Sequence, residues 1–181
     1  MVRVRSAGGF TLLEVLVAVF VLAIGVLGAA ATQLTALRTR HQSSLMSNGV
    51  QLASSLADSM RANLETMRAA DSANPYLRLQ YDVADGAPQA PGASCFPGDG
   101  CSAAQLADAE LYRFKDALHA GFPGGRAVVC RDSQVRDGAR GALRWTCAGA
   151  AQAPIVIKLG WRDDAGDSAP SVAIALPGVI E

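Results

Sequence analysis

The sequence lacks the patterns that would point to catalysis, to nucleic-acid binding or to a bound metal. It contains no G-x-S-x-G, no phosphate-binding loop and no H-E-x-x-H, so it predicts no enzyme. It has no basic run and no aromatic platform, and its 16 basic and 16 acidic residues cancel, so we expect no nucleic-acid partner. There is no C-x-x-C, and His41 and His119 lie far apart in sequence, so we expect no cofactor and disfavour a zinc site.

The cysteines indicate an oxidising compartment. Cys95, Cys101, Cys130 and Cys147 all lie in the C-terminal half, downstream of a long apolar segment. An even number in that position favours disulfides, with metal binding as the weaker alternative. Four cysteines allow three pairings. We expect the sequential one, Cys95 with Cys101 and Cys130 with Cys147, because each pair then closes a compact loop.

The most prominent feature is an apolar block near the N-terminus. Residues 15–31, VLVAVFVLAIGVLGAAA, contain no polar side chain, and residues 10–14 extend the block with only Thr11 and Glu14 as interruptions. A helix needs about 20 apolar residues to cross the hydrocarbon core of a bilayer. The segment of about residues 10–31 can therefore span a membrane.

A helical period continues beyond this block. Apolar side chains recur at steps of three, four or seven up to Met67, and no proline occurs before Pro75. The pattern predicts one helix from about Thr11 to Ala70, roughly 90 Å long. A small domain cannot bury such a helix, so we expect its first half to pack against lipid or other chains.

The remaining chain predicts a small α+β domain. Residues 71–101 form a loop region rich in proline, glycine and alanine, and Ser102 opens a short helix with a capping box. Two antiparallel hairpins are expected after that helix. Their strands are residues 126–131 with 143–147, and residues 155–162 with 171–176. We therefore predict a long helix, transmembrane in its first half, packed on a small antiparallel sheet.

Glu14 needs an explanation, because a carboxylate at the bilayer centre costs about 2.5–3.5 kcal/mol. One interpretation is a capping box with Thr11, or a position at the membrane interface. Another is an ordinary signal peptide, with Arg3 and Arg5 at its start and a cleavage site at residues 29–31. Ordinary signal peptides carry 7–15 apolar residues without an acid, and here the helical pattern continues past the cleavage site.

A third interpretation places cleavage before the apolar block, after Gly9. The flexible Gly8–Gly9 pair fits a protease groove, and cleavage would give Phe10 a free, positively charged amine. That amine is a natural partner for Glu14 of a neighbouring copy. Because desolvation offsets much of the attraction, such a pair would set register more than it would add stability.

The segment GFTLLEVLVAVFVLAIGVLG resembles the class III leader junction of type IV prepilins. The resemblance implies that prepilin peptidase cleaves after Gly9 and N-methylates Phe10, and that Glu14 is needed for assembly. The organisation would then be a leader at residues 1–9, a long helix at 10–70 and a disulfide-bonded periplasmic region at 71–181. Helix residues from about 38 to 70 would belong to the same domain.

Later segments resemble the PilV family of minor pilins, the type IV pilus modification proteins. These segments are LASSLADSMRAN at residues 52–63, the loop from Cys95 to Cys101, and FPGGRAVVC at residues 122–130. The resemblance implies a single-pass protein of the bacterial inner membrane with a periplasmic C-terminal domain, later carried in the pilus. It would join other minor pilins and the major pilin, help to prime pilus assembly at the tip, and support adhesion and twitching motility.

Two alternatives to a minor pilin remain open from the sequence. Pseudopilins of type II secretion share the N-terminal motif, so that motif does not separate the two systems. A membrane-anchored periplasmic binding domain outside any filament is a third possibility.

Overall fold

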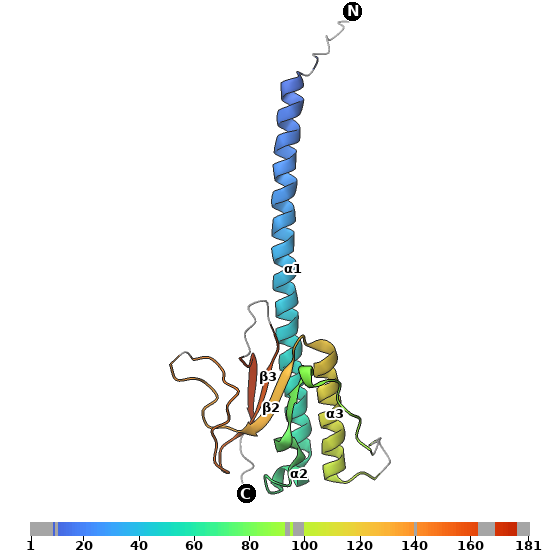
Figure 1. The fold of residues 1–181 in the computed structure, drawn as a ribbon, viewed down its shortest axis with the longest axis vertical. Coiled ribbons are helices and arrows are strands. Elements are labelled where there is room, and N and C mark those ends of the chain that lie inside the picture. Colours follow the sequence, from blue (N-terminus) through green and yellow to red (C-terminus); the bar gives the residue numbers. More distant parts are fainter. Residues whose placement is uncertain are drawn as a thin grey trace, which may run out of the picture. The chain divides into compact units, whose positions relative to one another are not determined.

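The computed structural model describes residues 9, 11–92, 95, 100–139, 141–162 and 169–176. The chain divides into two compact units, Met1–Ser44 and Leu45–Glu181. Of the expected leader, Gly9 alone is among the described residues, and Phe10 lies outside them. The expected α+β class, with a long N-terminal helix and a small antiparallel sheet, is confirmed (Figure 1).

The long helix α1 extends over Leu12–Ala62, and a separate short helix α2 follows at Leu64–Arg68. The expectation of one unbroken helix to Ala70 is therefore wrong in its last turns. The cause is Asn63, whose side-chain oxygen accepts the N–H of Thr66 and so caps a new helix. Asparagine competes for backbone hydrogen bonds in this way and favours helix ends over helix interiors.

The helix α3 occupies Ala103–Gly121, as the sequence predicts. Ser102 and Gln105 form both bonds of the capping box: the Ser102 hydroxyl accepts the N–H of Gln105, and the Gln105 side chain accepts the N–H of Ser102. Two short 3-10 turns, η1 at Pro75–Arg78 and η2 at Val83–Asp85, lie before α3.

The sheet of the C-terminal unit has four antiparallel strands in the order β1-β2-β3-β4. The strand bounds are β1 Gln80–Asp82, β2 Arg126–Arg131, β3 Ile155–Gly160 and β4 Val172–Leu176. The expected β3–β4 hairpin is confirmed. The strand β1 falls in the segment 71–101 that the sequence predicts to be loop, so that prediction missed it.

The expected hairpin of residues 126–131 with 143–147 is wrong. The strand β2 pairs with β1 on one side and β3 on the other, and residues 143–147 take part only in an isolated bridge between Arg136 and Leu143. The carbonyls of Arg144 and Thr146 instead accept hydrogen bonds from Lys158 of β3, at 2.8 Å each. The segment therefore lies over the sheet and does not extend it.

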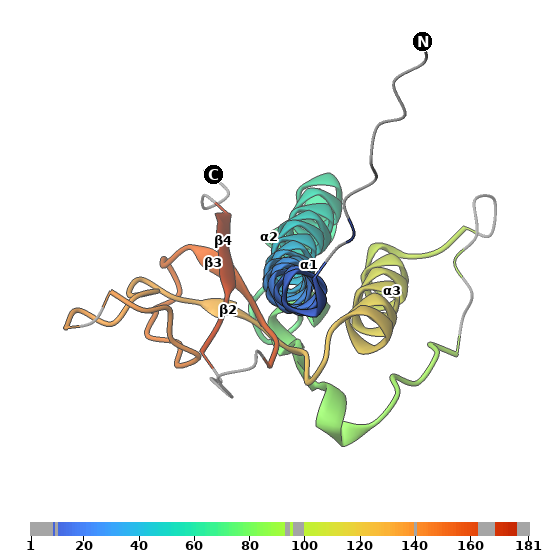
Figure 2. The same cartoon turned by 90° about the horizontal axis from the view of Figure 1, so that it is seen from above.

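The hydrophobic core lies between the sheet and the helices. The last turns of α1 are placed between the sheet and α3, and both views agree on this arrangement (Figures 1 and 2). Alternate residues of β3 face this core, and α3 contributes one apolar face. Its most completely buried apolar side chains are Ala53, Ala57, Met60, Tyr76, Ala107, Leu118, Ala127, Ile157 and Leu159.

The opposite face of β3 carries a buried ion pair. The Lys158 Nζ atom lies 2.5 Å from Asp132 Oδ2, and both side chains are 0% exposed. Asp132 also accepts the N–H groups of Gln134 and Ala148. Burial by itself raises the pKa of Asp132, but the hydrogen bonds from Lys158 and these two N–H groups outweigh it, so the pKa lies below its ordinary value of 3.8.

Candidate processing and assembly site

The sequence-predicted processing residues lie at the start of α1. Gly9 is exposed and outside the helix, and α1 begins at Leu12. The Glu14 N–H donates to Thr11 Oγ1 at 3.3 Å, so Thr11 caps the helix. Phe10, the other expected processing residue, lies outside the described residues.

The Glu14 carboxylate has no partner among the described residues. The Glu14 side chain is exposed, and it makes no hydrogen bond or ion pair with any described residue. A complete capping box would require the Glu14 carboxylate to accept the backbone N–H of Thr11, and among the described residues the Thr11–Glu14 pair shows only the other half. The carboxylate is therefore available to a cation from another molecule.

The surface around Glu14 is apolar. Large hydrophobic side chains from Leu12 to Leu37 are half or more exposed, and no side chain is buried in the most apolar 18-residue stretch of α1. By length and composition α1 can cross a membrane. Apolar surface of this extent in one continuous stretch marks a segment that contacts lipid or another chain.

The four cysteines form two disulfides, Cys95–Cys101 and Cys130–Cys147, which is the sequential pairing expected from the sequence. The second bridge does not staple a hairpin, because Cys147 lies in the segment that covers the sheet. It joins that segment to β2, close to the Lys158–Asp132 pair. Both the bridge and the ion pair therefore hold the same covering segment.

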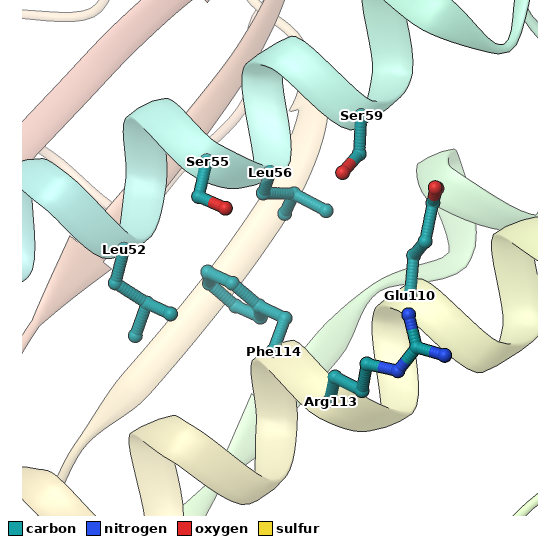
Figure 3. A pocket seen from close by; sticks show the side chains of 7 residues that line it. All are labelled: Leu52, Ser55, Leu56, Ser59, Glu110, Arg113 and Phe114. Carbon is teal, nitrogen blue, oxygen red and sulfur yellow. The ribbon is translucent and has the colours of Figure 1, made fainter.

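A groove lies between α1 and α3 in the C-terminal unit. Figure 3 shows Phe114 of α3 pointing toward Leu52 and Leu56 of α1. Its polar rim consists of Ser55, Ser59, Glu110 and Arg113. The groove holds about 210 Å³, below the roughly 300–1,000 Å³ of small-molecule sites.

Glu110 of that groove also belongs to a hydrogen-bond network within the fold. The Tyr76 hydroxyl donates to Glu110, and Asn63 Nδ2 donates to the Tyr76 hydroxyl at 3.3 Å and to the Ala103 carbonyl at 2.8 Å. Burial first, and then the bond to Glu110, raise the pKa of Tyr76 above its ordinary value of 10. This network ties the break between α1 and α2 to α3, and we assign it a structural role.

The histidines and acids of the described residues form no cluster of three or more that could hold a metal ion. His119 contacts the Tyr81 hydroxyl through Nδ1 at 2.8 Å, near the end of α3. Sequence reasoning disfavoured a zinc site at His119. It missed the Lys158–Asp132 pair, for which no local pattern gives a signal.

Comparison with known proteins gives a match at the N-terminus. Residues 4–30 match the family model described as the prokaryotic N-terminal methylation motif. No curated protein and no solved structure gives a significant match to the chain. The chain therefore carries a prokaryotic N-terminal methylation motif, typical of type IV pilin-like proteins, and this motif implies a pilin-like or pseudopilin-like protein.

Proposed function

We propose that the chain is a minor pilin of a type IV pilus, made as a prepilin and cleaved between Gly9 and Phe10. The observation that carries the proposal is the Glu14 carboxylate, which lies within the matched methylation motif on an otherwise apolar helix surface and has no partner among the described residues. No described residue of the chain pairs with this charge. A cation of a second subunit would supply the partner.

Cleavage supplies that cation. Hydrolysis after Gly9 leaves an N-terminal amine on Phe10, and methylation of the nitrogen keeps its positive charge. Two unit charges 4 Å apart attract by about 1 kcal/mol in water and by about 4 kcal/mol at an effective dielectric constant of 20. Because desolvation offsets part of this gain, the pair between Phe10 and Glu14 of adjacent subunits sets axial register.

The two units of the chain suit the two environments of such a protein. The apolar surface of α1 matches an inner membrane before assembly and neighbouring helices after it. The disulfides of the C-terminal unit match the oxidising bacterial periplasm. The partners are prepilin peptidase, other minor pilins and the major pilin, in a priming complex at the pilus tip that supports adhesion and twitching motility.

The assignment to a minor pilin, of the PilV type, rests on the resemblance of the later segments. In the structure the segment 52–63 supplies Leu56 and Met60 to the core and ends at the helix break of Asn63. Residues 122–130 form the turn into β2 and most of that strand. Both segments thus belong to the folded domain, and the role at the tip follows from the resemblance.

A type II secretion pseudopilin is the second candidate, and the methylation motif favours it equally. Co-purification from the native host followed by mass spectrometry separates the candidates. Recovery with pilus subunits supports the minor pilin, and recovery with secretion-system subunits replaces it with the pseudopilin. Recovery with neither supports a membrane-anchored binding domain.

The start of the mature protein tests processing. We expect N-terminal sequencing to begin at an N-methylated Phe10. A Gly9→Ala variant keeps a small residue and should be cleaved, whereas Gly9→Leu should block cleavage. A mature chain that begins after Ala31 would establish an ordinary signal peptide and overturn the proposal.

A Glu14→Gln variant tests the assembly role. Glutamine keeps the size but cannot neutralise an amine, so we expect normal cleavage, normal unfolding and poor recovery with partner pilins. Glutamine also fits a capping box, so a cap-only role predicts normal recovery. Glu65→Gln on α2, away from the motif, is the matched control and should leave recovery unchanged.

A further inference from the structure

Thr11 determines where α1 begins. Its carbonyl accepts the N–H groups of Glu14 and Val15 at 3.1 and 3.3 Å, and its Oγ1 atom accepts the N–H of Glu14 at 3.3 Å. These are the contacts of an N-cap residue, which stands outside the helix while its side chain satisfies a first-turn N–H. Leu12 is accordingly the first helical residue.

This boundary matters for the peptide bond after Gly9. Gly9 is exposed and makes no hydrogen bond to any described residue. If α1 began one turn earlier, the Gly9 carbonyl would accept the N–H of Leu13 and the helix would cover the carbonyl carbon. A peptidase must reach that carbon, and its donors must reach the oxygen on which negative charge develops.

We propose that Thr11 is a positioning residue for leader cleavage, because its cap holds the start of α1 at Leu12 and so leaves the Gly9 carbonyl outside the helix. The inference rests on the processing proposed above. The reaction consumes one water, breaks the Gly9 C–Phe10 N bond, and leaves a carboxylate on Gly9 and an amine on Phe10. Thr11 touches neither reacting atom and acts through the backbone.

A set of Thr11 variants separates capping from direct recognition of the side chain. Thr11→Val keeps the shape and removes the acceptor, whereas Thr11→Ser and Thr11→Asn keep an acceptor and change the shape. As N-caps, asparagine and serine equal or exceed threonine, and valine is far poorer. Capping therefore predicts fast cleavage for the Ser and Asn variants and slow cleavage for the Val variant. Recognition of the threonine shape predicts the opposite order.

The experiment uses the full-length precursor in proteoliposomes with purified prepilin peptidase, and mass spectrometry follows leader release at several substrate concentrations. We expect kcat/KM to fall about fivefold for Thr11→Val, the effect of about 1 kcal/mol, with Ser and Asn at the wild-type value or above. Thr32→Val is the matched control, because the Thr32 hydroxyl bonds to the Ala29 carbonyl inside α1, and its cleavage rate should not change.

Each outcome bears on one proposal or on both. A wild-type precursor that is not cleaved after Gly9 overturns the processing and the Thr11 inference together. A cleaved wild type with Thr11→Val at the same rate overturns the Thr11 inference alone. Slow cleavage of the Ser and Asn variants with normal cleavage of the Val variant also overturns it, in favour of direct recognition.

Discussion

Residues 12–44 and residues 45–176 meet opposite surroundings within the chain. In the first region almost every large apolar side chain is more than half exposed, and Glu14 has no partner among the described residues. In the second, β3 is buried along its whole length, and even its lysine is fully enclosed and paired. The described part of the second region buries its apolar side chains and pairs its buried charges within the chain, whereas the apolar surface of the first region calls for contact with a membrane or other subunits. Substitutions should therefore change folding in one region and association in the other.

The largest expected effect on folding is at Lys158. Lys158→Ala leaves the buried Asp132 carboxylate without its cation and two carbonyls without their donor, so unfolding should become easier by about 3–5 kcal/mol. Urea unfolding of the full chain in detergent, followed by the fluorescence of Trp145 and Trp161, measures this loss. Arg61→Ala breaks an exposed pair with Asp58 and is the control, at below about 1 kcal/mol.

The Asp132 pKa gives this prediction a pH dependence. Because the pKa is lowered in the folded state, the stabilisation is present above the unfolded value of 3.8 and is lost as the pH falls through the lower folded value. The wild type and Lys158→Ala should therefore converge in stability only in strong acid. A difference below 1 kcal/mol at pH 7 would contradict the structural role of the pair.

The next largest losses of folding stability are expected on removal of the disulfides. Replacing Cys130 and Cys147 by serine opens a loop with a sequence separation of 17, which should cost about 3 kcal/mol. Replacing Cys95 and Cys101, with a separation of 6, should cost about 1 kcal/mol less in the chain-entropy account. The same unfolding measurement compares the two double variants. The reverse order would show that the covering segment does not depend on its bridge.

Alanine substitutions at two glycines of α1, one in each region, allow the packing of the two regions to be compared directly. A Cβ atom at Gly49 would lie 2.6 and 2.9 Å from ring atoms of Trp161, whereas one at Gly25 would meet nothing within 4 Å. Overpacking costs about 1–3 kcal/mol and the helix gains about 1 kcal/mol from alanine, so Gly49→Ala should lose up to about 2 kcal/mol. Gly25→Ala should leave the Trp-detected transition unchanged. A stabilising Gly49→Ala would contradict the close approach of α1 and Trp161.

The smallest effect is expected at Asp71. Its carboxylate receives two bonds from Arg131, at 2.6 and 2.8 Å, but it is 44% exposed, so Asp71→Asn should cost less than about 1 kcal/mol. The bond from Arg131 lowers the pKa of Asp71, so this stabilisation is present above 3.8 and is lost in stronger acid. Unfolding at pH 7 and at pH 3 in low and high salt measures it. An effect independent of pH would exclude the ion pair as its source.

Sequence patterns predicted the elements whose signals are local. The apolar block predicted α1, Ser102 and Gln105 predicted the start of α3, and the apolar runs around residues 163–170 predicted the β3–β4 hairpin. The likeness to prepilins was also inferred from a short segment, and residues 4–30 match the model of the N-terminal methylation motif, whereas cleavage after Gly9 stays a prediction. Each of these signals acts over a few residues or turns, so it can be recognised without knowledge of the rest of the chain.

The errors lie where distant residues compete for the same backbone groups. The sequence of residues 143–147 is typical of a strand. In the structure, however, the carbonyls of Arg144 and Thr146 accept hydrogen bonds from Lys158, and β2 pairs with β1 and β3. Asn63 ends α1 because its side chain caps α2 and also reaches Tyr76 and the Ala103 carbonyl. The hydrophobic period of a sequence carries no information on such hydrogen bonds between distant residues.

The sequence by itself determined the apolar helix, the position of its acid, the capped helix and the α+β class, because propensity, capping and hydrophobic period act locally. Only the tertiary structure decided which strand lies beside β2, where α1 ends and how Lys158 is paired. Those choices follow from the cost of leaving a buried charge or backbone group without a partner, and that cost is set by residues that are distant in sequence and adjacent in the fold.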